Sequence, residues 1–308
     1  MKNFLGKEKL IIAEVGQNHQ GSLEYALKYV EEFSKAGADV IKFQTRNNKY
    51  LFAAEAYNKI YDNENSFGET YGLHREKLEL KVDWLPIIKK KCHENGVLFM
   101  STPFDELSLD LLCDINVDLL KIASFDLGNL SFINLISKKQ IPVVISTGGG
   151  NLDIVKKSIQ ILSKNKIEIS VLHCVSEYPT PPERLGLDKI KELKNHFKSC
   201  TIGLSDHFNG TLSGPLGYMM GARVFEKHVT LNRSWKGTDH AFALEPNGFA
   251  KFVRDINRVE IMKKPKPETE LGKEFVFTKL GKSVVAKKNI SKGETFKLEN
   301  LSGLIFNK

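Results

Sequence analysis

The sequence has 308 residues, of which 41% are hydrophobic, and a formal net charge of +8 at pH 7. This length suits one large α/β domain with a small appendage, and the apolar content allows a sizeable core. The lysines are spread along the chain, without an arginine-rich tract or interleaved aromatic residues. This pattern argues against nucleic-acid binding and favours a solvated surface that also attracts small anions.

The cysteines and the N-terminus indicate the compartment. Cys92, Cys113, Cys174 and Cys200 are widely separated and form no Cys-x-x-Cys pair, which argues against a zinc ribbon or a redox motif. Residues 1–8 lack the apolar centre of a signal peptide, and no apolar run approaches the ~18 residues of a membrane span. We therefore expect a soluble, cytoplasmic protein.

The first predicted unit is a strand, a polar loop and a helix. The apolar run 10–15 is too short for a helix and is typical of a buried parallel strand. After the loop 16–21, Ser22 is placed to cap a helix that Gly37 ends.

This unit recurs along the chain. The eight predicted strands are 10–15, 39–44, 97–101, 118–123, 142–146, 168–174, 201–205 and 223–229. The later predicted helices are 83–95 (capped by Asp83), one from about 105, then 130–138, 152–164, 187–196 and one from 247. The long segment 45–81 and the Gly/Leu-rich segment 206–220 are assigned no element.

Eight strand–helix units in about 250 residues predict a closed (β/α)8 TIM barrel, which we assign to residues 1–262. An open, doubly wound sheet is the alternative, but no Gly-x-Gly-x-x-Gly follows the first strand. Residues 263–274 are a charged, proline-containing linker. Within 275–308, the runs 283–286 and 290–294 suggest short strands and a turn.

Polar side chains stand at the ends of nearly all the predicted strands, where barrel enzymes place their chemistry. They are Glu14, Lys42, Gln44, Thr102, Lys121, Ser124, Ser146, Thr147, His173, Ser176, Ser205, His207, Glu226 and His228. An unpaired buried charge costs several kcal/mol, so a chance pattern of this kind is rare. Structural caps and buried ion pairs are the alternative for each residue taken singly.

The character of these residues suggests the ligand. Lys42 and Lys121, together with nearby hydroxyl groups, suit a phosphate and a carboxylate. His207 and His228 end neighbouring predicted strands, and two imidazoles suit a metal of the Mn, Fe, Co and Zn group. His19, His173 and His240 are candidates to lie near the site, but we do not assign them as ligands.

Ordered motifs match a known family. They are 12–19 (IAEVGQNH), 40–45 (VIKFQT), 101–104 (STPF), 121–124 (KIAS), 146–148 (STG), 172–181 (LHCVSEYPTP), 203–207 (GLSDH), 226–228 (EKH) and 237–240 (GTDH). The chain resembles the sialic acid synthase family, which includes legionaminic and pseudaminic acid synthases. Members condense phosphoenolpyruvate with an N-acetylmannosamine-type amino sugar, giving a nine-carbon 2-keto acid and phosphate.

The resemblance implies a role for each matching residue. The divalent metal, usually manganese, would be held by His207 and His228. Phosphoenolpyruvate would contact Lys42, Thr102, Lys121, Ser124, Ser146, Ser176 and Ser205, and the sugar would contact Glu14, Gln44, Phe104, Tyr178 and Asp239. Glu14, Lys42, Lys121, His207 and His228 form the implied catalytic set, and the implied reaction is that of a carbon–carbon bond-forming transferase.

The resemblance also implies a C-terminal antifreeze-like (SAF) domain. Residues 275–308 would form only its first part, because the Lys-Arg-Pro-Gly-type motif of relatives is absent from this sequence. The family forms homodimers, and the shortened domain leaves open whether that domain is exchanged or the barrels alone make contact.

Three interpretations of function remain at this point. The first is the metal-dependent condensing enzyme, and the second is a non-catalytic descendant that binds a ligand or partner with an incomplete lid. The third is a barrel aldolase or a keto-deoxy sugar-phosphate synthase, which fits the Ser-Asp-His and Glu-Lys-His runs less well. The sequence does not name the amino sugar.

Overall fold

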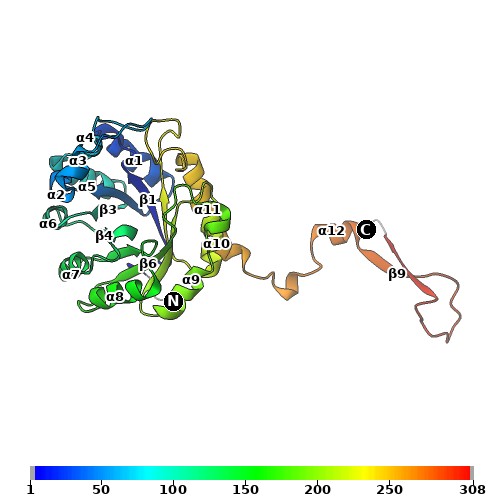
Figure 1. The fold of residues 1–308 in the computed structure, drawn as a ribbon. Helices are drawn as coiled ribbons and strands as arrows, with labels where there is room; N and C mark the ends of the chain where they lie inside the picture. The colour runs from blue at the N-terminus through cyan, green and yellow to red at the C-terminus, as the bar shows by residue number, and fades with distance from the viewer. Residues whose placement is uncertain (1–3, 306–308) are drawn as a thin grey trace. The chain divides into compact units, whose positions relative to one another are not determined.

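The computed structural model describes residues 4–305, which divide between Val259 and Glu260 into two compact units. In the first unit, eight parallel strands form a closed barrel in the order β1 to β8, with helices around it (Figure 1). Strand β8 pairs with β1, from Leu10 beside Val224 to Glu14 beside His228. This closure confirms the predicted TIM-barrel fold, and the open-sheet alternative is wrong.

The strands lie within a few residues of their predicted positions. They are β1 (Leu10–Gly16), β2 (Val40–Thr45), β3 (Leu98–Pro103), β4 (Leu119–Ile122), β5 (Val143–Ser146), β6 (Ile169–Cys174), β7 (Thr201–Asp206) and β8 (Val224–His228). The main outer helices are α1 (Leu23–Lys35), α5 (Leu85–Glu94), α6 (Glu106–Asp114), α7 (Leu130–Lys138), α8 (Leu152–Ser163), α9 (Lys189–His196), α10 (Ser213–Met220) and α11 (Pro246–Met262).

Alternation along each strand separates two cores. Leu10, Ile12, Val40, Met100 and Val224 belong to a cluster inside the barrel that also includes Phe4. Their neighbours in sequence point outward and pack against the helices in a second, larger cluster. Because side chains on a strand alternate between faces, residues two positions beyond this inner cluster point into the barrel at its C-terminal end.

Short polar side chains cap several helices where they begin. Ser22 accepts a hydrogen bond from Tyr25 N, as the sequence predicts, and Asp105 accepts one from Ser108 N at the start of α6. The predicted cap at Asp83 is wrong. A 3-10 turn, η1 (Val82–Trp84), precedes α5, which has a proline in its first turn and no side-chain cap. Proline lacks a backbone donor, so the start of α5 needs less capping.

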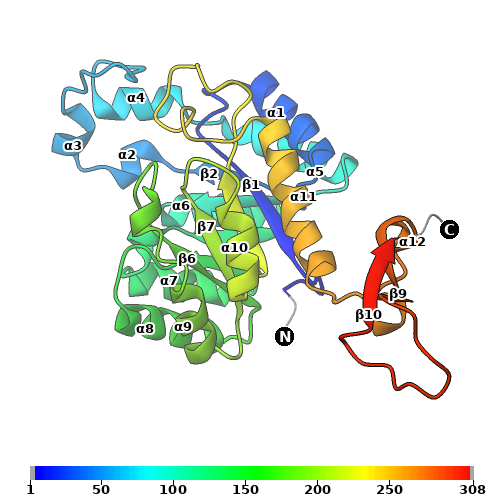
Figure 2. The same cartoon turned by 90° about the vertical axis from the view of Figure 1, so that its right-hand side faces the viewer.

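The segment 45–81 is not a plain loop. It contains three short helices, α2 (Asn48–Leu51), α3 (Ala54–Asn58) and α4 (Tyr71–Lys77). These helices have four, five and seven residues, too few to show a helical period in sequence. Figures 1 and 2 show the three helices grouped together on one side of the barrel.

Helices α10 and α11 lie side by side on the outside of the barrel (Figure 2). A Cβ added at Gly214 of α10 would stand 2.3 Å from the ring of Phe252 of α11, so only glycine allows this approach. Among residues 4–305, no helix is both long and apolar enough to cross a membrane.

The second unit contains a short helix, α12 (Phe275–Leu280), and an antiparallel pair, β9 (Lys282–Ala286) and β10 (Leu301–Ile305). The predicted strand at 283–286 is confirmed, whereas the second strand lies at 301–305 and not near 290–294. Residues 292 and 293 form a turn in the connecting loop. The side-chain amide of Asn300 holds that loop by donating to Glu294 Oε1 and Thr295 O.

A buried ion pair joins β7 to β8 from the helix side. Lys227 Nζ lies 2.7 Å from Asp206 Oδ2, and both side chains are fully buried. Lys227 also donates to Phe208 O, and Asp206 accepts from Ser213 Oγ and from Phe208 N. Each member directly precedes a histidine that points the other way, so the pair fixes the relative height of His207 and His228.

We predict that Lys227→Met lowers the free energy of unfolding by about 3–5 kcal/mol, because it leaves a buried carboxylate without its cation. The double variant Asp206→Leu/Lys227→Met should be less destabilised than Lys227→Met, since it buries no charge. Urea denaturation of the three proteins measures this difference. A double variant as unstable as the sum of the two single variants would contradict the prediction.

Buried histidines predict a loss of stability in acid. Burial lowers the pKa of His19 from 6.5 to about 3, and His19 Nδ1 accepts a hydrogen bond from Gly21 N. The unfolded chain therefore binds a proton below pH 6.5 that the folded chain refuses, so stability falls as the pH drops from 6.5 towards 3.

The variant His19→Gln should lose less stability as the pH falls below 6.5, by up to about 1.4 kcal/mol of unfolding free energy per pH unit. Urea denaturation at several pH values between 4.5 and 7 measures the slope. The exposed histidine variant His196→Gln serves as the control and should keep the wild-type slope. Equal slopes for His19→Gln and the wild-type protein would refute this assignment.

Candidate active site

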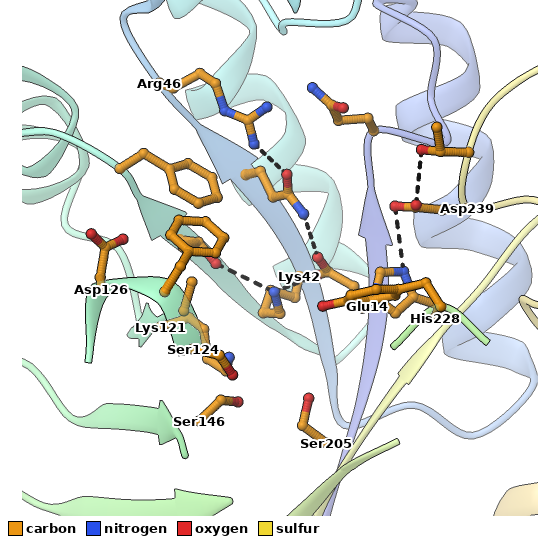
Figure 3. Close-up of a pocket in the computed structure, with 18 of the residues that line it drawn as sticks. Glu14, Lys42, Arg46, Lys121, Ser124, Asp126, Ser146, Ser205, His228 and Asp239 are labelled. Atoms are coloured by element: carbon orange, nitrogen blue, oxygen red, sulfur yellow. Dashed lines mark hydrogen bonds and ion pairs between the residues drawn. The ribbon is translucent and has the colours of Figure 1, made fainter. Parts of the chain in front are cut away.

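A cavity of about 500 Å³ opens at the C-terminal ends of the barrel strands (Figure 3). It is lined by nearly all of the predicted site residues, from all eight strand ends and the loops after them. These are Glu14, Lys42, Gln44, Thr102, Phe104, Lys121, Ser124, Ser146, Tyr178, Ser205, His207, His228 and Asp239. Ser176 alone of the predicted set does not line it; its side chain is exposed beside Gly148.

Buried charges form a network across the inside of the barrel. Lys42 Nζ lies 2.7 Å from Glu14 Oε2 and 3.4 Å from Glu226 Oε1, and it donates to Thr102 Oγ1 at 3.3 Å. Lys121 Nζ lies 3.7 Å from the other oxygen of Glu226. The backbone register explains the first contact, because Glu14 stands beside Lys42 in the β1–β2 ladder. The four groups are almost completely removed from water.

The pKa values of the two carboxylates of this network shift in opposite directions. Burial raises the pKa of Glu14 above its ordinary value, and the negative charge of Glu226 adds to this effect. The pKa of Glu226 is lowered, because Lys121 and Lys42 together outweigh its burial. Glu14 is thus the group that more readily holds a proton, and its protonation leaves two lysines facing one carboxylate. The network then carries a positive charge that suits an anionic ligand.

The hydroxyl groups lie on the wall formed by β4, β5 and β7. Ser124 Oγ accepts from Gly148 N at 3.2 Å and donates to Cys174 Sγ at 3.3 Å. Ser146 Oγ is buried and has no hydrogen-bond partner among residues 4–305. Leaving a buried polar group unsatisfied costs about 1–3 kcal/mol, so this hydroxyl is available to a ligand.

The two histidines meet at the β7–β8 edge. Their ring centroids are 5.3 Å apart, and the ring of Tyr178 lies 4.1 Å from that of His207. His207 Nδ1 donates to Val175 O at 2.7 Å, and His207 O accepts from Thr180 N at 3.0 Å. This bond places a proton on Nδ1 of His207. Burial opposes protonation of the ring, but the hydrogen bonds with Cys174 and Val175 raise the pKa of His207 above its ordinary value.

Burial keeps the imidazole of His228 in its neutral form. Its burial lowers the pKa to about 3, and its Nδ1 has no hydrogen-bond partner in the described part of the chain. The nearest acidic atom is Asp239 Oδ2 at 3.8 Å, beyond hydrogen-bond distance. Two imidazoles that face one cavity from neighbouring strands fit the donor set of a divalent transition metal.

No group of three or more His, Cys, Asp or Glu side chains between residues 4 and 305 is arranged to hold a metal. The predicted pair would therefore leave most coordination positions to water or substrate, as in an open metal site. The metal stays a prediction at this point.

The predicted sugar-binding residues lie on the β1–β2 side and around the mouth. Gln44 Nε2 donates to Glu14 Oε1 at 2.9 Å, and Gly16 allows this contact. Gly16 has φ +56°, and an added Cβ would lie 3.3 Å from Gln44 Nε2. Phe104 stacks on Phe125 with ring centroids 5.4 Å apart.

The remaining histidines have structural partners. His173 Nε2 donates to Leu185 O at 2.7 Å, and His240 Nδ1 lies 2.7 Å from Thr230 Oγ1. Neither lines the cavity, and His19 does not line it either.

Sequence reasoning missed one carboxylate and two arginines of the site. Glu226 was noted as a strand-end residue but given no role, because its contacts with lysines cross the barrel. Arg46 and Arg75 come from the segment 45–81 and also line the cavity. A signal for Arg46 was present, since Lys42, Gln44 and Arg46 repeat at the two-residue period of one strand face.

Known proteins share this sequence and fold. Residues 29–266 match the NeuB family. The chain is 36% identical to N-acetylneuraminate-9-phosphate synthase of Mus musculus, over 95% of this chain and 82% of that protein. It is 35% identical to N,N'-diacetyllegionaminic acid synthase of Campylobacter jejuni, over 96% of this chain and 90% of that protein.

A solved structure agrees with these sequence matches. The N-acetylneuraminic acid (sialic acid) synthetase of Leptospira borgpetersenii superposes with a TM-score of 0.76 at 30% identity, over 87% of this chain and 90% of that one. The family match spans strands β2 to β8, and the match to the Mus musculus protein covers 95% of the chain. The chain therefore belongs to the NeuB family of sialic-acid-type synthases.

Proposed function

We propose that this enzyme condenses phosphoenolpyruvate with an N-acylated mannosamine-type sugar, in a reaction that depends on a divalent metal. The products are a nine-carbon 2-keto acid and phosphate. One observation carries the proposal: buried lysines, an unsatisfied serine hydroxyl and two histidines converge in a single cavity. The names of the relatives agree with it, since each describes the synthesis of a sialic-acid-like product.

The lysine network is the proposed phosphoenolpyruvate site. The ligand carries a phosphate and a carboxylate, and Lys42 and Lys121 supply positive charge where water is excluded. Ser146 Oγ donates a hydrogen bond from the adjacent wall, and the hydroxyl of Ser124 turns from Cys174 Sγ to the ligand. The proposed contact of Ser176 requires its exposed side chain to turn towards the ligand. Thr102, already bonded to Lys42, orients that ammonium group.

The sugar lies between this site and the mouth. Its open-chain aldehyde is directed towards the histidines, and its hydroxyls meet Glu14, Gln44, Asp239 and Tyr178. Phe104 provides an apolar surface. Holding both reactants in one cavity supplies the proximity that a bimolecular condensation otherwise lacks.

The reaction forms one bond and breaks another. C3 of phosphoenolpyruvate attacks the aldehyde carbon, and the new alkoxide takes up a proton. Water adds to the resulting cationic C2, and the bond between C2 and the phosphate oxygen breaks to give the keto acid. Glu14 is the proposed proton carrier, because burial raises its pKa and it lies beside the sugar and Lys42.

His207 and His228 are the residues that would hold the metal. A divalent cation bound there would polarise the aldehyde carbonyl as a Lewis acid. Manganese is the proposed ion, because imidazole nitrogen with oxygen from water and substrate suits it.

The proposal extends to the rest of the protein. Residues 275–308 represent part of an antifreeze-like (SAF) domain, supported by the resemblance of 284–294. The enzyme acts in the cytoplasm as a homodimer. The names of the relatives include both a 9-phosphate product and an unphosphorylated legionaminic acid, so they do not decide the terminal group of the sugar.

We expect the purified protein to release phosphate from phosphoenolpyruvate only when both Mn²⁺ and an N-acetylmannosamine-type sugar are present. Chelation by EDTA should abolish turnover, and added Mn²⁺ should restore it. A phosphate assay with mass spectrometry of the keto acid measures both. Binding of phosphoenolpyruvate without product, across a panel of such sugars, would support the non-catalytic alternative.

The metal site has its own test. His207→Ala should lower kcat by at least roughly 100-fold, since it removes an inner ligand and not merely an outer partner. Calorimetry should show weaker Mn²⁺ binding, and the circular dichroism spectrum should not change. His196→Ala, on the exposed face of α9, is the matched control and should behave as wild type. Unchanged Mn²⁺ binding by His207→Ala would refute the ligand assignment.

A further inference from the structure

Two arginines stand at the outer part of the cavity, away from the lysine network. Arg46 follows β2, and Lys42, Gln44 and Arg46 all line the cavity. At about 3.3 Å per residue, Arg46 lies about 13 Å along the chain from Lys42. Arg75 belongs to α4 and lines the same wall. Figure 3 shows Arg46 apart from Glu14 and Lys42, and Gln44 connects it to them by accepting from Arg46 and donating to Glu14.

These arginines carry more positive charge than their partners balance. Arg46 Nε lies 3.3 Å from Glu79 Oε1, and its side chain is 5% exposed. Arg75 has only neutral partners: it donates to the Tyr71 hydroxyl at 2.9 Å and to Gln17 Oε1. Burial raises the pKa of Glu79 to about 7, so the one nearby carboxylate is partly protonated at neutral pH. Two guanidinium groups therefore share less than one full negative charge.

The other acidic groups of the cavity are engaged elsewhere. Glu14 and Glu226 contact the lysines, and Asp239 faces His228. Asp126 belongs to the turn η2 (Ser124–Asp126), where Figure 3 shows it apart from Arg46. The arginine surplus is consequently local, although the lining as a whole contains equal numbers of basic and acidic side chains.

The fixed geometry of Arg46 favours a planar or tetrahedral oxyanion. Its guanidinium lies 4.2 Å from the centre of the Phe104 ring and also donates to Gln44 Oε1. A guanidinium that is stacked and bonded in this way keeps its remaining N–H groups in one direction. Arginine pairs of this kind bind phosphate with charge-assisted hydrogen bonds.

We propose that Arg46 and Arg75 form an anion subsite that binds a phosphate group on the terminal C6 of the amino sugar. This inference rests on the proposed function, which places the aldehyde C1 at the histidines and the other end of the open chain towards the mouth. Phosphoenolpyruvate adds three carbons at C1, so C6 of the sugar becomes C9 of the product. The preferred substrate is then a hexosamine 6-phosphate, and the product is a 9-phosphate.

The test compares N-acetylmannosamine with N-acetylmannosamine 6-phosphate on the full chain, with Mn²⁺ and phosphoenolpyruvate. Phosphate release gives the rate, and mass spectrometry identifies the keto acid. We expect kcat/KM to be at least 10-fold higher for the phosphorylated sugar. Equal or better use of the unphosphorylated sugar would overturn the subsite while leaving the proposed function intact.

Substitutions of Arg75 distinguish binding of the sugar phosphate by this residue from a purely structural role. Arg75→Gln should lower the ratio of the two kcat/KM values at least 10-fold, chiefly by raising KM for the phosphorylated sugar. Arg75→Lys should keep part of the preference, and Arg258→Gln, on the exposed face of α11, should leave the ratio unchanged. An unchanged ratio in Arg75→Gln would overturn the proposal.

If the protein turns over neither sugar, the proposed function is contradicted. Binding measurements then test the anion subsite independently. In calorimetry with phosphoenolpyruvate present, the wild-type protein should bind N-acetylmannosamine 6-phosphate more tightly than Arg75→Gln does. Equal affinities would reject the subsite.

Discussion

The contact of Lys42 with two carboxylates is the constraint on which the cavity depends. An ammonium group at this depth is stable only because Glu14 and Glu226 lie 2.7 and 3.4 Å away, on strands on either side of the barrel seam. Any ligand that enters must compete with this arrangement or complete it. An anion that also meets Lys121 completes it, because protonation of Glu14 leaves the lysines in excess.

The barrel follows from alternation along short apolar strands. Inner residues such as Ile12 and Val40 build the floor, and the next inward positions, Glu14 and Lys42, become the polar layer above it. That part could be predicted from sequence, because the period of two and the apolar strand bodies are local signals. The closure between β1 and β8 followed from the count of units.

The other features of the site and the fold depend on contacts between distant residues, which no local sequence pattern encodes. The pairing of Glu226 with both lysines spans the barrel, and the short helices of 45–81 show no apolar period. The position of Arg75, in α4, could therefore not be predicted before the fold was known. Asp83 had the character of a helix cap, but a 3-10 turn and Pro86 set the start of α5 instead. The 3-10 turn before α5, and not the capping propensity of Asp83, determines where this helix begins.

The ion pair between Asp206 and Lys227 has a consequence for how such a protein can diversify. It secures the two histidine strands from the helix side, whereas the arginines come from a separate insertion between β2 and β3. The histidine pair and the arginines of the cavity wall are thus encoded by separate parts of the chain. Under the proposed function, mutations in the insertion would change the accepted sugar without disturbing the spacing of the imidazoles, so that a new specificity would need only small steps.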